Sequence, residues 1–382
     1  MRTFSDQMKQ LADSLAIDDL TDRLSRLVKG AVRQCYNDIG TRHPWKYFVR
    51  WKLINLTPPY SDGTVGYTAA TRTLTLTGGT WPDWTGLGVV LLNRNVYQVE
   101  RVVDSTHLIL KSEQCPVDDV DAGTAYTLAQ TAYDLPADFL GLRALLELER
   151  LWAVGYLSPE ELLARSQLWF YPGAVFFYTI MGGANGRLQL VWSPPPSEAR
   201  TFTVLYQAKP RPFTLTAPYS SGKITTVAGS ATVTIAGGTL PQNIEGCICR
   251  VGTSTKPPDP LTGDNPYVEE FVIKSRVSDT QFTVSTAAVY SSSACLYEID
   301  DPIDITWDPL LTYFDAMCEA RTLQRHQADV GRIGFADRME RQAYVKAMEA
   351  DDRFTPRALQ ARGVPNNLYD LFFGVTPHGA GA

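Results

Sequence analysis

Histidine, paired cysteine motifs and long apolar runs are scarce in this sequence, and each scarcity argues against a class of function. The 382 residues include 4 histidines and 6 cysteines, and no Cys-x-x-Cys pair occurs. Zinc sites are usually built from closely spaced cysteines and histidines, so we expect no metal site and interpret the cysteines as small buried thiols. Because no run approaches the roughly 20 apolar residues of a membrane helix, we expect no membrane contact. The polar N-terminus does not resemble a signal peptide, which predicts folding in a cytoplasm.

Motifs of common enzymes are also missing. The sequence contains no Gly-x-Ser-x-Gly elbow, no Walker loop, no dinucleotide-binding glycine motif after a strand and no His-Glu-x-x-His. Two acidic clusters, at residues 118–121 and 300–304, lack the ligand spacing of a calcium loop, and we interpret their aspartates as turn formers. A carboxylate pair for glycoside hydrolysis leaves no spacing signature and stays open. We nevertheless expect no enzyme, no catalytic residue and no cofactor.

The net charge of the chain is unfavourable for binding nucleic acid. The net charge is −6, whereas a protein that binds phosphates is basic, at least locally. One modest basic run alternates with aromatic residues, and it comprises Arg42, His43, Lys46, Arg50 and Lys52. This alternation favours a strand with one solvent-exposed face over a DNA contact.

A phrase that occurs twice indicates two related β modules. Residues 73–82 read Thr-Leu-Thr-Leu-Thr-Gly-Gly-Thr-Trp-Pro, and residues 232–241 read Thr-Val-Thr-Ile-Ala-Gly-Gly-Thr-Leu-Pro. Alternating β-branched and apolar residues followed by Gly-Gly are typical of a strand and a turn. Each copy continues to a tyrosine strand, which begins at Tyr126 and at Tyr297. Because two copies do not make a solenoid, we expect two small closed modules carried on a separate body.

Periodicity predicts the elements of that body. Leucines and other apolar residues at three- and four-residue spacing predict a helix over 19–39, with Gly40 just past its end. Asp308 and Pro309 are expected to cap and start another helix. The stretch 142–154 is ambiguous between helix and strand. The remaining expected elements are helices over 5–15, from Ser158 and over 335–350, and strands over 45–56, 175–181, 187–192 and 201–207.

The last residues form an arm without periodicity. Within residues 354–382 lies one cluster of large apolar side chains, made of Leu368, Tyr369, Leu371, Phe372 and Phe373. Such a cluster is costly to leave in water. We predict that it docks on the protein's own body or on a partner, and that residues 354–376 become ordered only against another subunit or a portal.

The order of these parts resembles the head-to-tail adaptor, or connector, proteins of tailed bacteriophages. The resemblance rests on short phrases: Tyr-Asn-Asp-Ile-Gly at residues 36–40, Tyr-Asp-Leu-Pro-Ala-Asp-Phe at 133–139, and three longer stretches at 188–196, 202–210 and 303–311. It spans roughly residues 5–350. Small threonine- and glycine-rich β modules are also common in phage virion proteins.

The resemblance implies a structural role in the neck of a virion, after synthesis in the host cytoplasm. It implies a homo-oligomeric ring of twelve subunits that binds the phage portal protein and a tail or nozzle protein. DNA would pass through the lumen without sequence-specific binding, since an overall acidic protein repels it. An alternative is a phage tail-associated carbohydrate-binding or receptor-binding protein. However, Trp81 of the first module corresponds to Leu240 of the second, which favours packing over a sugar platform.

We therefore expect an α+β fold. A helical body, made of N-terminal and C-terminal helices, would carry a small antiparallel sheet and two mutually similar small β-barrel or sandwich modules. The expected segments are N-terminal helices and strand (1–61), first module (62–129), sheet and helix of the body (130–218), second module (219–299), C-terminal helices (300–353) and extended arm (354–382).

Overall fold

A computed structural model describes residues 1–15, 22–147, 154–166, 171–183, 186–258, 269–326 and 329–353. The chain divides into two compact units. Unit 1 combines Met1–Phe48 with Lys209–Ala382, and unit 2 is Val49–Ala208. The sequence predicted six segments, and that finer division remains a prediction.

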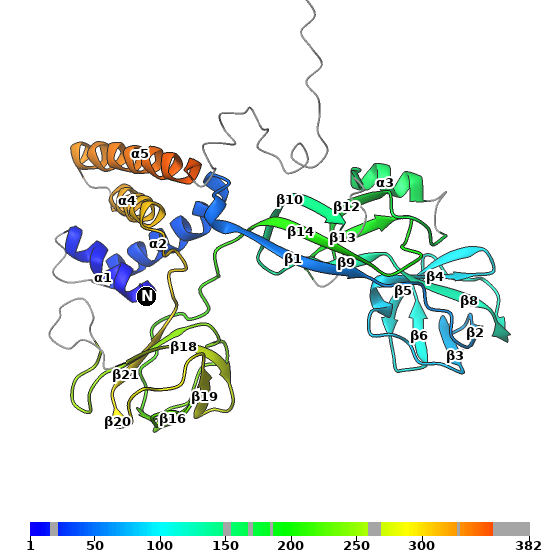
Figure 1. Cartoon of the computed structure of the whole chain (residues 1–382), viewed down its shortest axis with the longest axis horizontal. Coiled ribbons are helices and arrows are strands. Elements are labelled where there is room, and N and C mark those ends of the chain that lie inside the picture. The colour runs from blue at the N-terminus through cyan, green and yellow to red at the C-terminus, as the bar shows by residue number, and fades with distance from the viewer. Residues whose placement is uncertain are drawn as a thin grey trace, which may run out of the picture. The chain divides into compact units, whose positions relative to one another are not determined.

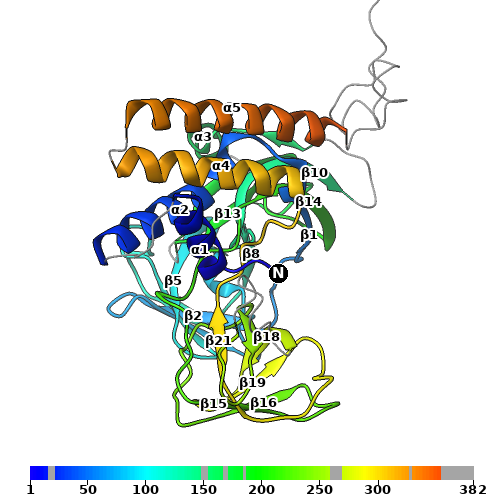
Figure 2. The ribbon, with the colours of Figure 1, turned by 90° about the vertical axis from the view of Figure 1, so that its left-hand side faces the viewer.

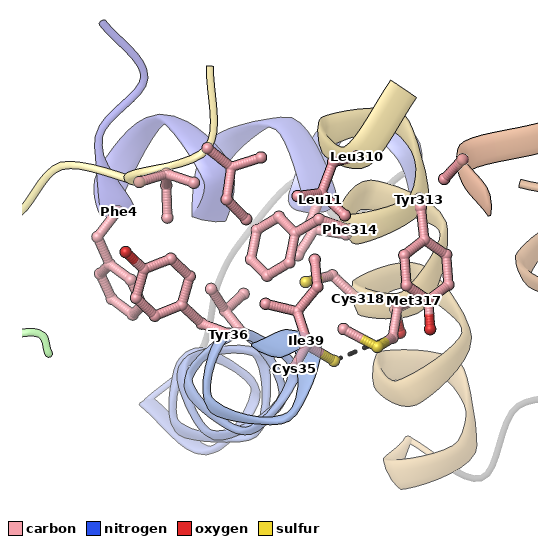
Figure 3. Packing of buried hydrophobic residues seen from close by; sticks show 14 of the residues in the cluster. Phe4, Leu11, Cys35, Tyr36, Ile39, Leu310, Tyr313, Phe314, Met317 and Cys318 are labelled. Carbon is pink, nitrogen blue, oxygen red and sulfur yellow. Dashed lines mark hydrogen bonds between the residues drawn. The ribbon is translucent and has the colours of Figure 1, made fainter. Parts of the chain in front are cut away.

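Four helices of unit 1 share one hydrophobic core. They are α1 (Phe4–Ser14), α2 (Asp22–Arg42), α4 (Asp308–Arg325) and α5 (Val330–Asp352). Tyr36 and Ile39 of α2 pack against Phe314 and Met317 of α4, and all four are fully buried (Figure 3). Figure 2 shows α4 and α5 side by side. Three- and four-residue spacing in the sequence therefore does define the packed face of α2 and α4.

The helix ends differ from the sequence predictions. The stop expected at Gly40 is wrong, because α2 continues to Arg42. The Trp45 indole N–H donates to the Ile39 carbonyl at 2.9 Å and the Thr41 hydroxyl to the Asp38 carbonyl at 2.8 Å. These bonds satisfy carbonyls of the last turn, a role that a left-handed glycine cap fills in many helices. At α4 the N-cap is Trp307, which makes no side-chain cap, so Asp308 is not the expected cap.

Two seven-stranded sheets, one in each unit, have the same strand order. In unit 2 the order is β7-β2-β3-β6-β5-β4-β8, and in unit 1 it is β20-β15-β16-β19-β18-β17-β21. The strands of unit 2 are β2 (Thr64–Thr68), β3 (Thr73–Thr77), β4 (Gly88–Leu92), β5 (Asn95–Val102), β6 (His107–Leu110), β7 (Val120–Thr124) and β8 (Tyr126–Gln130). Those of unit 1 are β15 (Lys223–Thr226), β16 (Thr232–Ala236), β17 (Ile248–Val251), β18 (Glu269–Arg276), β19 (Gln281–Val284), β20 (Ser292–Cys295) and β21 (Tyr297–Asp300).

Equivalent hydrogen bonds confirm that the two sheets repeat one design. Trp81 donates from its backbone to the Ser105 carbonyl at 2.8 Å, and Leu240 donates to the Asp279 carbonyl at 2.7 Å. Trp81 and Leu240 are both buried, as expected of interchangeable packing residues. The repeated phrase therefore specifies a strand, a turn and a core position.

The rest of unit 2 consists of two smaller sheets around one core. One sheet has the order β1-β14-β10, made of β1 (Val49–Leu56), β14 (Arg200–Ala208) and β10 (Phe139–Glu147). The other has the order β11-β12-β13-β9, made of β11 (Gly155–Tyr156), β12 (Phe177–Gly182), β13 (Leu188–Ser193) and β9 (Ala132–Asp134). Their shared cluster includes Phe202, Val204 and Trp192. The helix α3 (Pro159–Ser166) starts as predicted, since the Ser158 hydroxyl accepts from the Glu161 N–H at 3.2 Å.

The fold is mixed α+β, dominated by strands and by antiparallel pairing. The expectation of a helical body is not well matched, because unit 2 has α3 as its single described α-helix and its core lies between sheets. The ambiguous stretch 142–154 is a strand as far as Glu147, and residues 148–153 lie outside the described part. The strand expected over 45–56 begins only at Val49, since residues 46–48 form a 3-10 turn.

Candidate interaction surfaces

The apolar cluster predicted to dock, Leu368–Phe373, lies outside the described residues. The basic run at 42–52 is divided by the structure. Arg42 donates to Glu340 at 2.8 Å, and the Lys46 ammonium donates to the Asp351 carbonyl at 2.9 Å. These contacts bind the first part of the run to α5. Only residues from Val49 onward form the strand that the alternation predicts.

The second acidic cluster has a structural task that its sequence did not reveal. Asp301 is 1% exposed and accepts hydrogen bonds from the backbone N–H groups of Thr214 and Leu215 at 2.9 and 2.7 Å. The Arg211 guanidinium donates to the same carboxylate at 3.0 Å. Among the described residues no group of histidine, cysteine and acidic side chains is arranged to hold a metal ion. The cluster thus anchors the chain entering the seven-stranded sheet of unit 1.

A buried ion pair joins that sheet to α1. Arg250, 4% exposed, donates to both carboxylate oxygens of Asp6 at 2.9 and 2.8 Å and to Glu270 at 2.9 Å. Comparing the two repeats would have revealed it. Leu128 and Ile299 hold equivalent positions in the two modules, and they pair with Val90 and Cys249 respectively. The next residues along these two strands, Leu91 and Arg250, are therefore equivalent. An arginine that replaces a leucine signals a contact specific to the second module.

Tryptophan rings can serve as platforms for sugars, and five tryptophans of this sequence invite that reading: Trp81, Trp84, Trp169, Trp192 and Trp307. Trp81 packs edge-on against Tyr126, with ring centroids 5.4 Å apart, and Trp192 is buried in the core of unit 2. Trp84 and Trp307 pack against their own hydrophobic clusters, and Trp169 lies outside the described residues. None of these four described rings forms an exposed platform.

One apolar surface of the three-stranded sheet of unit 2 is partly exposed. Even-numbered residues of β14 face the core, whereas the opposite face carries Trp51 and Leu53 of β1, which are 66% and 44% exposed. The strand register extends this face across the sheet, because Trp51 pairs with Leu205 and Leu53 with Thr203. We call this surface the open face; it consists of Trp51, Leu53, Leu205, Thr203, Ala144 and Leu146.

A second exposed apolar surface lies on α5. Phe335 and Met339, spaced four residues apart, are 58% and 44% exposed, so they share one side of the helix. Ala347, on another side of the helix, packs into the helical core. Exposed aromatic and methionine side chains on an ordered helix are typical of contact surfaces.

Unit 2 also contains a cavity of about 340 Å³ between β4, β5, β12 and β13. Its lining is mainly apolar, with Val89, Val99 and Leu162 among the wall residues. The two charged lining groups have partners: the Lys111 ammonium donates to Gln98 at 2.7 Å, and Glu100 accepts from Arg72 at 2.6 Å. The lining contains no histidine or cysteine.

The described residues thus present two exposed apolar areas, the open face and one side of α5. Residues 68–230 match the family described as SU10 adaptor protein, and this range covers less than half of the 382 residues. The match supports a phage adaptor-type protein, that is, a virion component that associates with other virion proteins. A comparison with curated proteins finds no match. Among the described helices, none combines the length and apolar character that a membrane crossing requires.

Proposed function

We propose that this chain is a head-to-tail adaptor, which forms a ring of twelve subunits between the portal and the tail of a tailed bacteriophage. The observation that carries the proposal is the family match over residues 68–230. It agrees with the order of sequence phrases on both sides of that range. The ring occupies the neck of the virion, contacts the portal protein and a tail or nozzle protein, and lets DNA pass during genome ejection.

The described surfaces support this assembly role. The open face and the exposed side of α5 give each subunit two apolar areas, and apolar areas of this kind become buried in oligomers. The net charge of −6 suits a channel for DNA, because like charges repel. The chain is a structural part without catalysis in this proposal, so zymography on cell-wall peptidoglycan should show no clearing.

The test is the mass of the purified full-length protein, alone and mixed with portal rings of the same phage. Native mass spectrometry is expected to give a complex of one portal ring with twelve copies of this chain. A mixture that retains separate portal rings and free chains at micromolar concentrations contradicts the proposal. In that case, binding of the protein to a glycan array would favour the carbohydrate-binding alternative.

The arm gives a second test. Deleting residues 354–376 is expected to abolish attachment to portal rings, because the apolar cluster of the arm is then missing. A truncated protein that attaches with undiminished affinity would exclude a docking role for the arm, while leaving the adaptor role itself untouched.

A further inference from the structure

A groove among the helices of unit 1 is lined by three arginines and two acids. The helix α4 lies between α2 and α5 (Figure 1). Where the last residue of α2 meets α5, two pockets of about 270 and 300 Å³ share Arg42, Glu340 and Arg341 in their walls. We call the two pockets together the arginine groove; its walls include Arg42, Tyr313, Arg321, Glu340, Arg341 and Tyr344.

Both acids of the groove already accept hydrogen bonds. Glu340 accepts from the Arg42 guanidinium at 2.8 Å, and the ion pair between them joins α2 to α5. Asp337 accepts from the side-chain amide of Gln324 on α4 at 3.0 Å. These two carboxylates therefore do not neutralise the other arginines.

The guanidinium groups of the groove have donors to spare. Arg321 and Arg341 make no hydrogen bond or ion pair with the residues that the structure describes. Arg42 uses its Nη1 atom for Glu340 and for the Tyr313 hydroxyl, at 2.8 and 3.3 Å, whereas its Nε and Nη2 groups donate to no described residue. Converging guanidinium donors favour an anion, because hydrogen bonds between opposite charges are the strong ones.

Two tyrosine rings form the wall beside these donors. Tyr313 projects from α4 (Figure 3) and lies against Tyr344 of α5, with ring centroids 5.2 Å apart. Burial raises the pKa of Tyr313 to about 12, although Arg42 acts in the opposite direction. The hydroxyl therefore keeps its proton at neutral pH, and in the described part of the chain this proton has no acceptor.

The charges and the size of the groove select one class of anion. Three arginines and two acids leave one positive charge uncompensated, and a doubly charged phosphate would also be repelled by Glu340 and Asp337. A carboxylate carries a single charge and matches the planar fork of a guanidinium. The pocket of about 270 Å³ has a mainly apolar lining between Tyr313 and Tyr344, which suits a ring or a branched chain.

We propose that the arginine groove binds a carboxylate that is attached to a small aromatic or branched aliphatic body. Arg42 and Arg341 donate to the carboxylate, and the ring of Tyr344 contacts the body. The carboxylate belongs to a free small molecule or to an acidic side chain of a partner protein, and the chemistry is the same in both. The inference goes beyond the adaptor role, and its test uses no portal, so the two can fail separately.

The test is a ¹⁹F NMR titration of the purified full-length protein with 4-fluorophenylacetate and with its neutral isostere, 4-fluorophenylacetamide. The carboxylate is expected to bind with a Kd of about 1 mM or lower, and about tenfold more tightly than the amide, because only the carboxylate forms charge-assisted hydrogen bonds. Equal affinities for the two probes would overturn the proposal, and so would the absence of carboxylate binding at about ten times that concentration.

The donors are tested by Arg341→Gln, which should weaken carboxylate binding about fivefold and leave amide binding unchanged. Arg341→Lys keeps the charge and should bind with intermediate affinity. The matched control is Arg338→Gln, because Arg338 is an exposed arginine of the same helix and does not line the groove. Its carboxylate affinity should stay within twofold of the unchanged protein. Tyr313→Phe, which keeps the ring and removes the hydroxyl, should also weaken carboxylate binding.

Thermal melting checks that the variants are folded, and Arg341 is suited to this design because no described residue depends on its bonds. If Arg341→Gln weakens binding no more than Arg338→Gln does, the proposal is wrong.

Competition against the fluorinated carboxylate identifies the source of the natural one. Displacement by the peptide acetyl-Phe-Glu-Phe-amide identifies an acidic side chain of a partner, and displacement by 3-phenylpropionate alone identifies a free small molecule; both support a carboxylate site. Displacement by inorganic phosphate at lower concentrations than by 3-phenylpropionate would overturn the proposal in favour of a general anion site.

Discussion

Arg250 holds its positive charge in a buried site, and its removal is expected to be costly. Arg250→Ala leaves the Asp6 carboxylate buried without its partner, which typically destabilises a protein by about 3 kcal/mol or more. Urea unfolding followed by circular dichroism measures the change. Leu91→Ala at the corresponding position of the first module is the control, since it removes an apolar group and leaves no unpaired charge. A loss below about 1 kcal/mol for Arg250→Ala would contradict a buried ion pair.

Glu298 gives a pH dependence of opposite sign to that of an ordinary surface acid. Burial first, and then repulsion from Asp300, raise the pKa of Glu298 above its usual 4.5. A raised pKa means that the folded state binds the proton more tightly, so this group's contribution to stability is lost as pH rises through the folded pKa. Glu298→Gln should therefore raise the melting temperature by about 2 °C at pH 7.

The same substitution should have no effect below pH 4, where the carboxyl group is protonated in both the folded and unfolded states. The measurement is a series of thermal melts between pH 3.5 and 7.5. A Glu298→Gln protein that is less stable than the original at pH 7 would show that the charged form makes a favourable contact.

At the scale of elements, the two modules predict matched responses to the same substitution. Gly63 and Gly222 have φ values of +79° and +85°, and an added Cβ would lie 2.3 Å from the Thr77 carbonyl oxygen and 2.4 Å from that of Ala236. Alanine at either position combines an unfavourable φ with a backbone clash, so each is expected to cost about 2–4 kcal/mol. Gly86→Ala is the control, because nothing lies within 4 Å of its Cβ position.

Chemical denaturation of the three variants checks this prediction. If Gly63→Ala lowers the free energy of unfolding and Gly222→Ala does not, the two modules share a strand order but differ in how their turns constrain the backbone. A large effect of Gly86→Ala would show that the destabilisation is not specific to the two left-handed positions.

Local sequence patterns predicted the elements that depend on near neighbours. The Ser158 cap, the hairpin formed by β12 and β13, and the repeat of the modules all follow from residues close together in the chain. Residues 142–147 have helix-forming composition but form β10, because pairing with β14, far away in sequence, overrides local propensity. The stop predicted at Gly40 is wrong for a different, local reason: the Trp45 indole N–H donates to the Ile39 carbonyl, which makes a glycine stop unnecessary.

The candidate surfaces were predictable only in part. The apolar cluster of the arm is visible in the sequence, and Trp51 and Leu53 alternate with charged residues as in any half-exposed strand. Which strand lies at a sheet border depends on the pairing of distant segments, and the sequence carries no local signal for it. The place of β1 at the border of its described sheet could therefore be recognised only once its pairing with β14 was seen.

At the scale of the whole molecule, the chain enters and leaves unit 2 at neighbouring points. Val49 of β1 pairs with Gln207 of β14, and paired residues of antiparallel strands lie roughly 5 Å apart. Unit 2 is one continuous segment, whereas unit 1 is made of two. Replacing residues 49–208 by a three-residue Gly-Ser linker should thus leave unit 1 able to fold, and residues 49–208 should fold alone.

Both proteins can be made and compared with the full chain by circular dichroism and by thermal melting. Each is expected to unfold cooperatively and to keep its strand signal, because each unit contains its own hydrophobic clusters. A segment 49–208 that melts without a transition would show that unit 2 requires unit 1. Mixing the folded fragments separately with portal rings then tests which unit makes the proposed portal contact.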